Sequence, residues 1–229
     1  MGSTRLPGKV LERVVGRPLL WHIVTRLRCS QRLDGLILAT STMPQDDVLE
    51  RFAADLDLSC FRGSELDVLS RYYQAATQWG ADVIVRVTGD CPLIDPKVVD
   101  SVINAHGRSG ADYTSNALVR TYPRGLDTEV LTYKVLATAY RAAKEDYERE
   151  HVTPYIWRHH ELFQLRSVEA EGKLRRPELR LTVDTEEDLS LIRSIYERLY
   201  PADPLFDTEK VIDLLEQQPE LTLLNKHGR

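Results

Sequence analysis

The sequence predicts an α/β fold built on a three-layer, mostly parallel β-sheet, and three observations support this. Strand-like and helix-like segments alternate over the first two thirds of the chain. The strand-like segments are apolar without alternation, which is typical of parallel strands buried on both faces. Polar loops follow these strands, and a β–α alternation of this kind places helices on both sides of one sheet.

The expected elements follow from local patterns along the chain. A helix begins near Pro18, because proline suits the first helical turn and the apolar residues after it recur at helical spacing. A strand is expected where the sequence DVIVRVT, rich in β-branched residues, is followed by Gly89. The expected helices cover residues 18–33, 46–58, 67–80, 95–106, 132–144, 146–161, 186–200 and 209–216, and the expected strands 35–40, 60–62, 82–88, 126–131, 164–168 and 179–183.

Two of these helices begin with candidate capping residues. Asp46 or Asp47 is a plausible N-cap, because a carboxylate accepts hydrogen bonds from the unpaired N–H groups of the first turn. Thr185 is followed three residues later by Asp188, which predicts a variant of the capping box.

The composition is that of one globular domain covering residues 1–229. Hydrophobic residues make up 42% and charged residues 28%, and the net charge is 30 − 35 = −5, which argues against a protein that coats nucleic acid or an anionic membrane. The three cysteines form no CxxC pair, so neither a disulfide framework nor a zinc site is indicated. The apolar runs are too short to span a bilayer, and no signal-peptide pattern opens the chain. We therefore expect a soluble cytoplasmic protein.

The N-terminal end is positively charged although the whole chain is acidic. Residues 1–28 contain six Lys and Arg residues against one Glu, a local balance of 6 − 1 = +5. The segment GSTRLPGK is not a Walker A loop, because five residues separate its glycines and Val10 follows the lysine. Small residues with Arg5 and Lys9 nevertheless suit a triphosphate, since backbone N–H groups and two cations can reach its oxygens. An ordinary surface loop remains the alternative.

Two aspartates follow apolar strand-like segments and are candidate metal ligands. Asp90 occurs in VTGDCP and Asp184 in LTVDT. At neighbouring strand ends, two carboxylates can share Mg²⁺, which completes its shell with phosphate and water oxygens. Either aspartate could instead be only a helix N-cap.

The segment EHVTPY contains a candidate catalytic or binding histidine, His151, with Glu150 before it and a threonine hydroxyl two residues after it. A single histidine is often purely structural, so this alternative stays open. The chain has no Gly-x-Ser-x-Gly elbow, and covalent acyl transfer therefore has no support in the sequence.

Five segments together resemble one enzyme family. Residues 3–9 (STRLPGK) resemble the nucleotide loop of the CMP-sugar synthetases, which are the acylneuraminate and Kdo cytidylyltransferases. Residues 89–95, 125–130, 149–155 and 182–189 are similar to motifs of the SpsF-like branch, named for spore coat polysaccharide biosynthesis. The motifs occur in the family's order between residue 2 and about residue 200.

The resemblance implies the nucleotide-diphospho-sugar transferase fold, which is GT-A-like. It also implies an Mg²⁺-dependent transfer of CMP from CTP to an acidic sugar or related acceptor, with release of pyrophosphate. The implied roles are phosphate binding by Arg5 and Lys9, loop shaping by Ser3, Thr4 and Gly8, nucleotide contact by Arg71, Mg²⁺ binding by Asp90 and Asp184, and acceptor binding by Asp127, Glu129, Glu150 and His151.

The chain departs from the family at its start. Family members begin with a buried strand before the phosphate loop, whereas Met1 directly precedes Gly2 here, so this first strand is expected to be missing. Because its loss would leave unpaired backbone groups and a gap in the core, we expect about ten further residues upstream in the intact protein. A non-catalytic nucleotide-binding relative is one alternative that this leaves open.

A glycosyltransferase of similar fold is the other alternative. Such enzymes usually carry an Asp-x-Asp at a strand end, and none follows the strand expected at 82–88. The sequence does not identify the acceptor, which residues 122–155 are expected to select. It also leaves the oligomeric state open, although members of the family commonly form homodimers.

Overall fold

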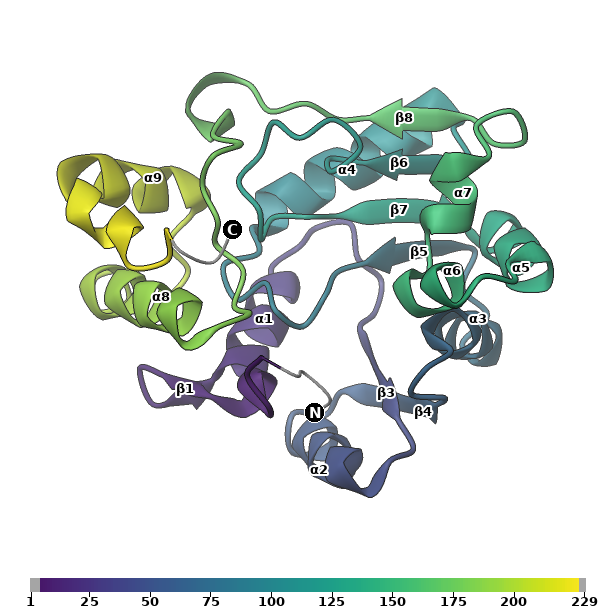
Figure 1. Cartoon of the computed structure of the whole chain (residues 1–229), viewed down its shortest axis with the longest axis horizontal. Helices are drawn as coiled ribbons and strands as arrows, with labels where there is room; N and C mark the ends of the chain where they lie inside the picture. Colours follow the sequence, from purple (N-terminus) through teal and green to yellow (C-terminus); the bar gives the residue numbers. More distant parts are fainter. Residues whose placement is uncertain (1–4, 227–229) are drawn as a thin grey trace.

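The computed structural model describes residues 5–226, in which strands form a central layer between helices (Figure 1). The larger sheet has the strand order β5-β7-β6-β8, and β3 and β4 pair as a separate sheet. Their bounds are β3 (Ile37–Ser41), β4 (Ser59–Gly63), β5 (Val83–Arg86), β6 (Tyr113–Ser115), β7 (Glu129–Thr132) and β8 (Leu165–Ser167). A short antiparallel hairpin, β1 (Arg13–Val14) with β2 (Arg17–Pro18), precedes them.

Most strands of the larger sheet run in one direction. Strand β7 pairs antiparallel with both β5 and β6, whereas β6 and β8 pair in parallel. Three of the four strands therefore point the same way, and β7 is the exception. The described residues 116–128, which connect β6 to β7, contain no helix, and antiparallel neighbours need no helical crossover. The predicted α/β class with a mostly parallel sheet is confirmed, with this one reversal.

Helices pack on both faces of the sheets. They are α1 (Leu19–Leu27), α2 (Asp47–Asp55), α3 (Val68–Gln78), α4 (Pro96–Ser109), α5 (Tyr133–Ala142), α6 (Asp146–His151), α7 (Pro154–Arg158), α8 (Glu186–Leu199) and α9 (Thr208–Gln217). Four short 3₁₀ turns are η1 (Lys9–Leu11), η2 (Pro44–Asp46), η3 (Gly172–Leu174) and η4 (Pro219–Leu223). Among the residues that the structure describes, no helix is both long and apolar enough to cross a bilayer.

The predicted helix caps have different outcomes. Thr185 and Asp188 form a full capping box at the start of α8, which confirms that prediction. Asp46 occupies the N-cap position of α2, but its side chain makes no cap hydrogen bond. Its carboxylate accepts hydrogen bonds from Thr40 and Ser41 instead, so it joins the end of β3 to the start of α2.

Two predicted elements differ from the structure, and one strand was missed. Residues 179–183 form no strand, only a single bridge between Arg180 and Arg124, and that prediction was wrong. The helix expected at 146–161 divides into α6 and α7 at Val152, whose φ of 75° lies outside the helical region. Strand β6 was not predicted, because three residues are too few to show a period.

Side chains of the larger sheet alternate between two apolar layers. Ile84 and Tyr113 both lie opposite Leu131 and face a cluster that α3, α5 and α7 cover. Val85 faces the other side, where residues of α1 and α4 pack against it. This alternation follows from the pleat of a strand, which turns successive side chains to opposite faces.

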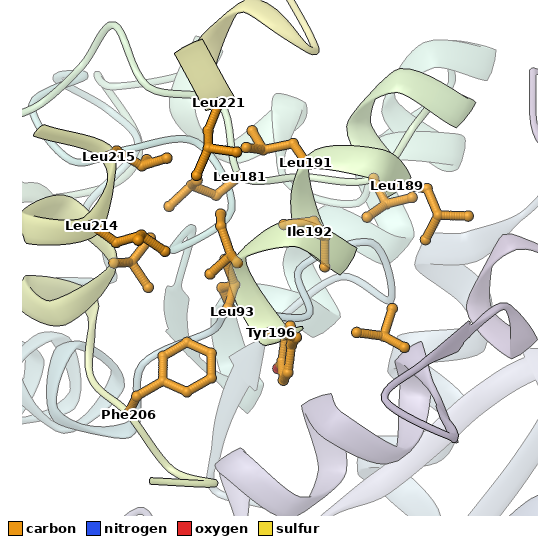
Figure 2. Close-up of a cluster of buried hydrophobic side chains, with 14 of the residues drawn as sticks. Leu93, Leu181, Leu189, Leu191, Ile192, Tyr196, Phe206, Leu214, Leu215 and Leu221 are labelled. Atoms are coloured by element: carbon orange, nitrogen blue, oxygen red, sulfur yellow. The ribbon is translucent and has the colours of Figure 1, made fainter. Parts of the chain in front are cut away.

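A separate apolar cluster holds the segment before α8 in place (Figure 2). Leu181 and Val183 are fully buried in it against side chains of α8 and α9. The hydroxyl of Tyr196 donates a hydrogen bond of 2.7 Å to the carbonyl oxygen of Pro92, in the loop after β5. The cluster therefore fixes two loops next to each other.

Gly125 permits a close approach between two chain segments. Its φ is +106°, and a Cβ at this position would lie 2.8 Å from the carbonyl carbon of Leu181. The neighbouring Arg124 donates its N–H to Leu179 O at 3.0 Å and accepts from Leu181 N at 2.7 Å. A side chain at residue 125 would push this segment away, so glycine is required here.

Buried histidines are expected to make stability depend on pH. Burial lowers the pKa of His22 from 6.5 and the charges of Arg26 and Arg17 add to this, which together outweigh the opposite effect of its hydrogen bond to Val14 O. The unfolded chain then binds more protons than the folded chain as the pH falls through 6.5. We expect the free energy of unfolding, measured by urea denaturation, to decrease between about pH 7.5 and about pH 5.5.

The variant His22→Gln, which keeps an N–H donor for the same carbonyl, should show a smaller decrease over this pH range. The exposed His160 offers a matched control, and His160→Gln should follow the wild-type curve. An identical pH dependence in wild type and His22→Gln would contradict the prediction.

Candidate active site

The N-terminal turn directs a lysine toward the interior. Gly8 adopts a left-handed conformation with φ 73°, which glycine adopts without steric strain, and Lys9 begins η1 directly after it. The turn is closed by a hydrogen bond of 2.9 Å from Leu11 N to Gly8 O. The side chain of Lys9 is 14% exposed and that of Arg5 is 60% exposed. The predicted loop residues Ser3 and Thr4 lie outside the described residues.

Asp90 lies in the loop that follows β5. Its Oδ1 accepts hydrogen bonds from the Thr88 hydroxyl and, at 3.4 Å, from the Cys91 thiol. Its backbone carbonyl accepts a hydrogen bond of 2.9 Å from Val183 N, which joins this loop to the segment before α8. One carboxylate oxygen, Oδ2, therefore remains directed toward the N-terminal turn.

Lys9 connects the two aspartates that the sequence singled out. Its Nζ lies 2.8 Å from Asp184 Oδ1 and 3.8 Å from Asp90 Oδ2, and it donates a further hydrogen bond of 2.7 Å to Val183 O. Arg5 Nη2 lies 3.1 Å from the same Asp184 oxygen. Four predicted site residues, up to 179 positions apart in sequence (184 − 5), are thus brought together in one cluster, the Lys9 cluster of Arg5, Lys9, Asp90 and Asp184.

Positive charge surrounds Asp184. Burial would raise its pKa, but hydrogen bonds and charge from Lys9 and Arg180, with the charge of Arg5, outweigh this and hold the pKa below its usual value. Asp184 is therefore ionised at neutral pH and presents a full negative charge to a cation.

The two carboxylates fit a divalent cation. Asp90 and Asp184 each turn one oxygen toward the same ammonium group, so the space between them already accommodates positive charge. Residues 5–226 contain no group of three or more His, Cys, Asp or Glu side chains placed to hold a metal. Two carboxylates with further oxygens from phosphates and water are a ligand set that suits Mg²⁺. That these residues bind Mg²⁺ stays a prediction.

Glu129, predicted to face an acceptor, is 9% exposed and fully hydrogen-bonded. Its Oε1 accepts from the Tyr113 hydroxyl at 2.5 Å and from the Thr153 hydroxyl at 2.7 Å, and its Oε2 pairs with Arg86. Arg86 ends β5 and Glu129 begins the antiparallel β7. This Glu129 cluster, made of Glu129 and its three partners, therefore lies at the end of β5 from which the Asp90 loop continues.

Asp127 lies two residues before Glu129, which begins β7 opposite the last residue of β5. Asp90 lies in the loop that continues from the same end of β5. The carboxylate of Asp127 pairs with the guanidinium of Arg120. A role of Asp127 in acceptor binding remains a prediction.

Glu150 and His151 are exposed at the end of α6, away from the Lys9 cluster. The ring of His151 contacts that of Tyr147, with 4.4 Å between centroids. Val152 follows with φ 75° and ψ −54°, and Thr153 N donates to His151 O at 2.9 Å across this tight turn. Such a conformation is strained for a β-branched residue, and the buried contact of Thr153 with Glu129 holds it.

Arg71 lies in α3, and its side chain packs against the end of β4 rather than joining the Lys9 cluster. It donates to Ser64 O at 2.9 Å, and its stem lies 3.2 Å from the position of a Cβ at Gly63. Burial lowers its pKa, and its Nε is buried without a hydrogen-bond partner among the described residues. Nucleotide contact by Arg71 stays a prediction.

The sequence did not indicate the residues that support this site. Thr88 and Arg180 each hold one aspartate, and Arg86 pairs with Glu129. The sequence could have drawn attention to Thr88 and Arg180 only by their spacing, two residues before Asp90 and four before Asp184. Polar residues near a loop have many other uses, so this spacing is a weak signal.

The chain matches the sequence model described as Cytidylyltransferase over residues 1–218. It is 38% identical to the spore coat polysaccharide biosynthesis protein SpsF of Bacillus subtilis over 225 residues, which cover 96% of this chain and 92% of that protein. It is 32% identical to the 3-deoxy-manno-octulosonate cytidylyltransferase of Solibacter usitatus over 101 residues, 44% of this chain and 39% of that protein.

The fold matches that of a solved cytidylyltransferase from Leptospira borgpetersenii. The TM-score is 0.90 at 32% identity, over 97% of this chain and 92% of that one. The family match includes Arg5, Lys9, Asp90 and Asp184, and the matches to SpsF and to the solved structure each cover more than nine tenths of this chain. On this evidence the chain belongs to the cytidylyltransferase family and is a cytidylyltransferase enzyme.

Proposed function

We propose that this protein transfers CMP from CTP to an acidic sugar or a related acceptor, with release of pyrophosphate, in the biosynthesis of a surface polysaccharide. The observation that carries the proposal is the position of Lys9, whose ammonium group lies between Asp90 and Asp184 with Arg5 beside it. Two cationic side chains next to two carboxylates form a site for a triphosphate and its counterion.

In the proposed reaction an oxygen of the acceptor attacks the α-phosphorus of CTP. The new bond joins that oxygen to phosphorus, the bond from phosphorus to the β-phosphate oxygen breaks, and pyrophosphate leaves with the bonding electrons. The acceptor hydroxyl loses its proton to solvent. Such a transfer depends mainly on positioning and on neutralising negative charge.

The chain's own residues supply much of this neutralisation. Arg5 and Lys9 would turn from Asp184 to the phosphate oxygens, because a triphosphate carries more negative charge than one carboxylate. Asp90 and Asp184 would hold Mg²⁺, which when bound neutralises phosphate charge. Gly8 keeps the turn tight enough for backbone N–H groups to approach the phosphates.

An acceptor would lie near the carboxyl end of β5. Asp127 and Glu129 are both close to this end, and the Glu129 cluster is tied through Thr153 to the turn that follows His151. We propose that Asp127, Glu129, Glu150 and His151 line the acceptor side, and that Arg71 contacts the nucleotide. The similarity to a 3-deoxy-manno-octulosonate cytidylyltransferase supports an acidic sugar as the acceptor class, and the similarity to SpsF supports a role in polysaccharide biosynthesis.

The experiment that tests the proposal is a pyrophosphate-release assay on the purified protein with Mg²⁺. CTP, UTP and ATP are compared, each with and without a panel of acidic sugars that includes nonulosonic acids and 3-deoxy-octulosonic acids. We expect release with CTP that depends on an acceptor and stops when EDTA removes the metal.

Two other outcomes would contradict the proposal and are distinguishable. A thermal shift on CTP binding without pyrophosphate release would identify a nucleotide-binding relative. In a parallel assay supplied with a sugar nucleotide instead of a nucleoside triphosphate, its consumption without pyrophosphate release would identify a glycosyltransferase.

A further inference from the structure

Arg180 holds the second oxygen of Asp184. While Asp184 Oδ1 faces Lys9, its Oδ2 accepts a hydrogen bond of 2.5 Å from Arg180 Nη2. The same guanidinium donates from Nε to Asp188 Oδ1 at 3.1 Å, so it connects the two carboxylates. A planar guanidinium that reaches two carboxylates fixes the orientation of both, which a flexible ammonium does not.

Asp188 anchors this arrangement inside the protein. Its side chain is 0% exposed, and its Oδ2 accepts from Asp184 N at 2.9 Å and from Thr185 N at 3.1 Å. A buried carboxylate requires paired charge and hydrogen bonds, and Arg180 supplies the charge. Asp188 therefore cannot move without losing the start of α8, and Arg180 is held with it.

A residue close to the C-terminal end completes the arrangement. Asn225 is 8% exposed and donates from Nδ2 to Arg180 O at 3.0 Å and to Asp188 Oδ1 at 3.1 Å. It follows η4, whose Leu221 packs in the apolar cluster of α8 and α9. The amide thus holds both the backbone of Arg180 and the carboxylate that binds its side chain.

We propose that Arg180 is a positioning residue, and that Arg180, Asp188 and Asn225 form a clamp that aims Asp184 Oδ1 at the cation between Asp184 and Asp90. This inference rests on the proposed function, because it assigns a task to the support of the proposed metal ligand. At Asp90 the Thr88 hydroxyl plays the part that the clamp plays at Asp184: it binds Oδ1 and leaves Oδ2 directed toward Lys9. Each aspartate therefore has one anchored oxygen and one presented oxygen.

The clamp makes the end of the chain part of the site. Asn225 lies 41 positions after Asp184 in sequence (225 − 184), yet only Arg180 and Asp188 separate the two residues in the hydrogen-bond network. Residues that orient a metal ligand typically change metal affinity or activity by about 10- to 100-fold when they are replaced. Replacement of clamp residues should therefore act on cation binding rather than on folding alone.

The test measures Mn²⁺ binding to the nucleotide-free protein by electron paramagnetic resonance, because Mn²⁺ takes the same oxygen ligands as Mg²⁺. Arg180→Lys keeps the positive charge but loses the planar fork, and its Mn²⁺ dissociation constant should rise about tenfold or more. Asn225→Ala changes no charge and should raise the constant in the same direction. Arg176→Lys is the matched control, since Arg176 pairs with Glu216 away from Asp184, and it should bind as wild type.

The outcomes separate the clamp from a purely structural role. A structural role would lower the unfolding temperature and leave the Mn²⁺ affinity of the folded protein unchanged, and affinities within about twofold of wild type in both variants would overturn the clamp. If Arg180→Lys does not fold, Asn225→Ala alone decides. Absence of pyrophosphate release by wild type would refute the proposed function while the Mn²⁺ comparison still tests the clamp. Absence of Mn²⁺ binding by wild type would overturn the clamp, and the pyrophosphate-release assay would still decide the proposed function.

Discussion

Replacement of Lys9 by methionine is expected to lower kcat/KM for CTP by about 100- to 1000-fold while the protein remains folded. Methionine keeps much of the length of the side chain but removes the charge that lies 2.8 Å from Asp184 and 3.8 Å from Asp90. The loss corresponds to about 2.7–4 kcal/mol of transition-state stabilisation, the usual effect of removing one preorganised donor from developing charge. Pyrophosphate release measures it.

The same variant is expected to bind Mn²⁺ at least as well as wild type when no nucleotide is present. The Lys9 ammonium lies between the two carboxylates, so its removal takes away a competing cation. Lys173→Met is the matched control, because Lys173 forms only an exposed pair with Asp213, and its activity should equal that of wild type. Full turnover by Lys9→Met would show that Lys9 does not act on the phosphates.

Replacement of Asp184 or of Asp90 by asparagine should also lower turnover by about 100-fold or more, but for a different reason. Each change removes one negative charge from the proposed pair of metal ligands. In contrast to Lys9→Met, both variants should bind Mn²⁺ more weakly than wild type in the absence of nucleotide. Turnover and Mn²⁺ affinity are measured on the same preparations. Turnover should fall in all three variants, whereas Mn²⁺ affinity should fall only in the two aspartate variants.

Asparagine has nearly the same shape as aspartate, so folding can be checked directly. Asp184→Asn removes the negative charge that Lys9, Arg5 and Arg180 share. Lys9 keeps Asp90 and Arg180 keeps Asp188 as carboxylate partners, and we expect a loss of about 1–3 kcal/mol in the free energy of unfolding. Turnover is assayed at temperatures below the unfolding transition of the variant, so that this loss of stability does not affect the measured rates. Asp213→Asn, at an exposed carboxylate, is the control. Unchanged Mn²⁺ affinity in both Asp184→Asn and Asp90→Asn would place the metal elsewhere.

Most helices and strands were predictable from local pattern, because their signals lie within a few consecutive residues. The helix that follows Pro18 and the strand 83–86 lie within their predicted ranges, and the capping box at Thr185 forms as expected. The misplaced strand at 179–183 shows the limit of this reasoning. That segment is apolar because it packs against α8 and α9, and apolarity alone does not distinguish such packing from a ladder.

The candidate site was predictable only in its charged residues. Arg5, Lys9, Asp90 and Asp184 are visible as charges in loops, and the structure gathers them. Glu129 was singled out as well, but its burial and its hydroxyl partners depend on which residues β6 and the turn after α6 place opposite it. No local pattern specifies such partners, since strand pairing is decided between distant segments.

By itself, the sequence determined the α/β class, the order of the elements and which charged residues follow strand ends, since periodicity, capping and turn chemistry act over a few neighbouring residues. Tertiary structure alone decided that Lys9 reaches across 175 positions to Asp184, and that Asn225 supports Arg180 from near the end of the chain. The physical reason is burial: the apolar cluster of α8 and α9 presses residues 181–183 against the Asp90 loop. Charges distant in sequence then meet in a partly dehydrated site, where each must have a partner.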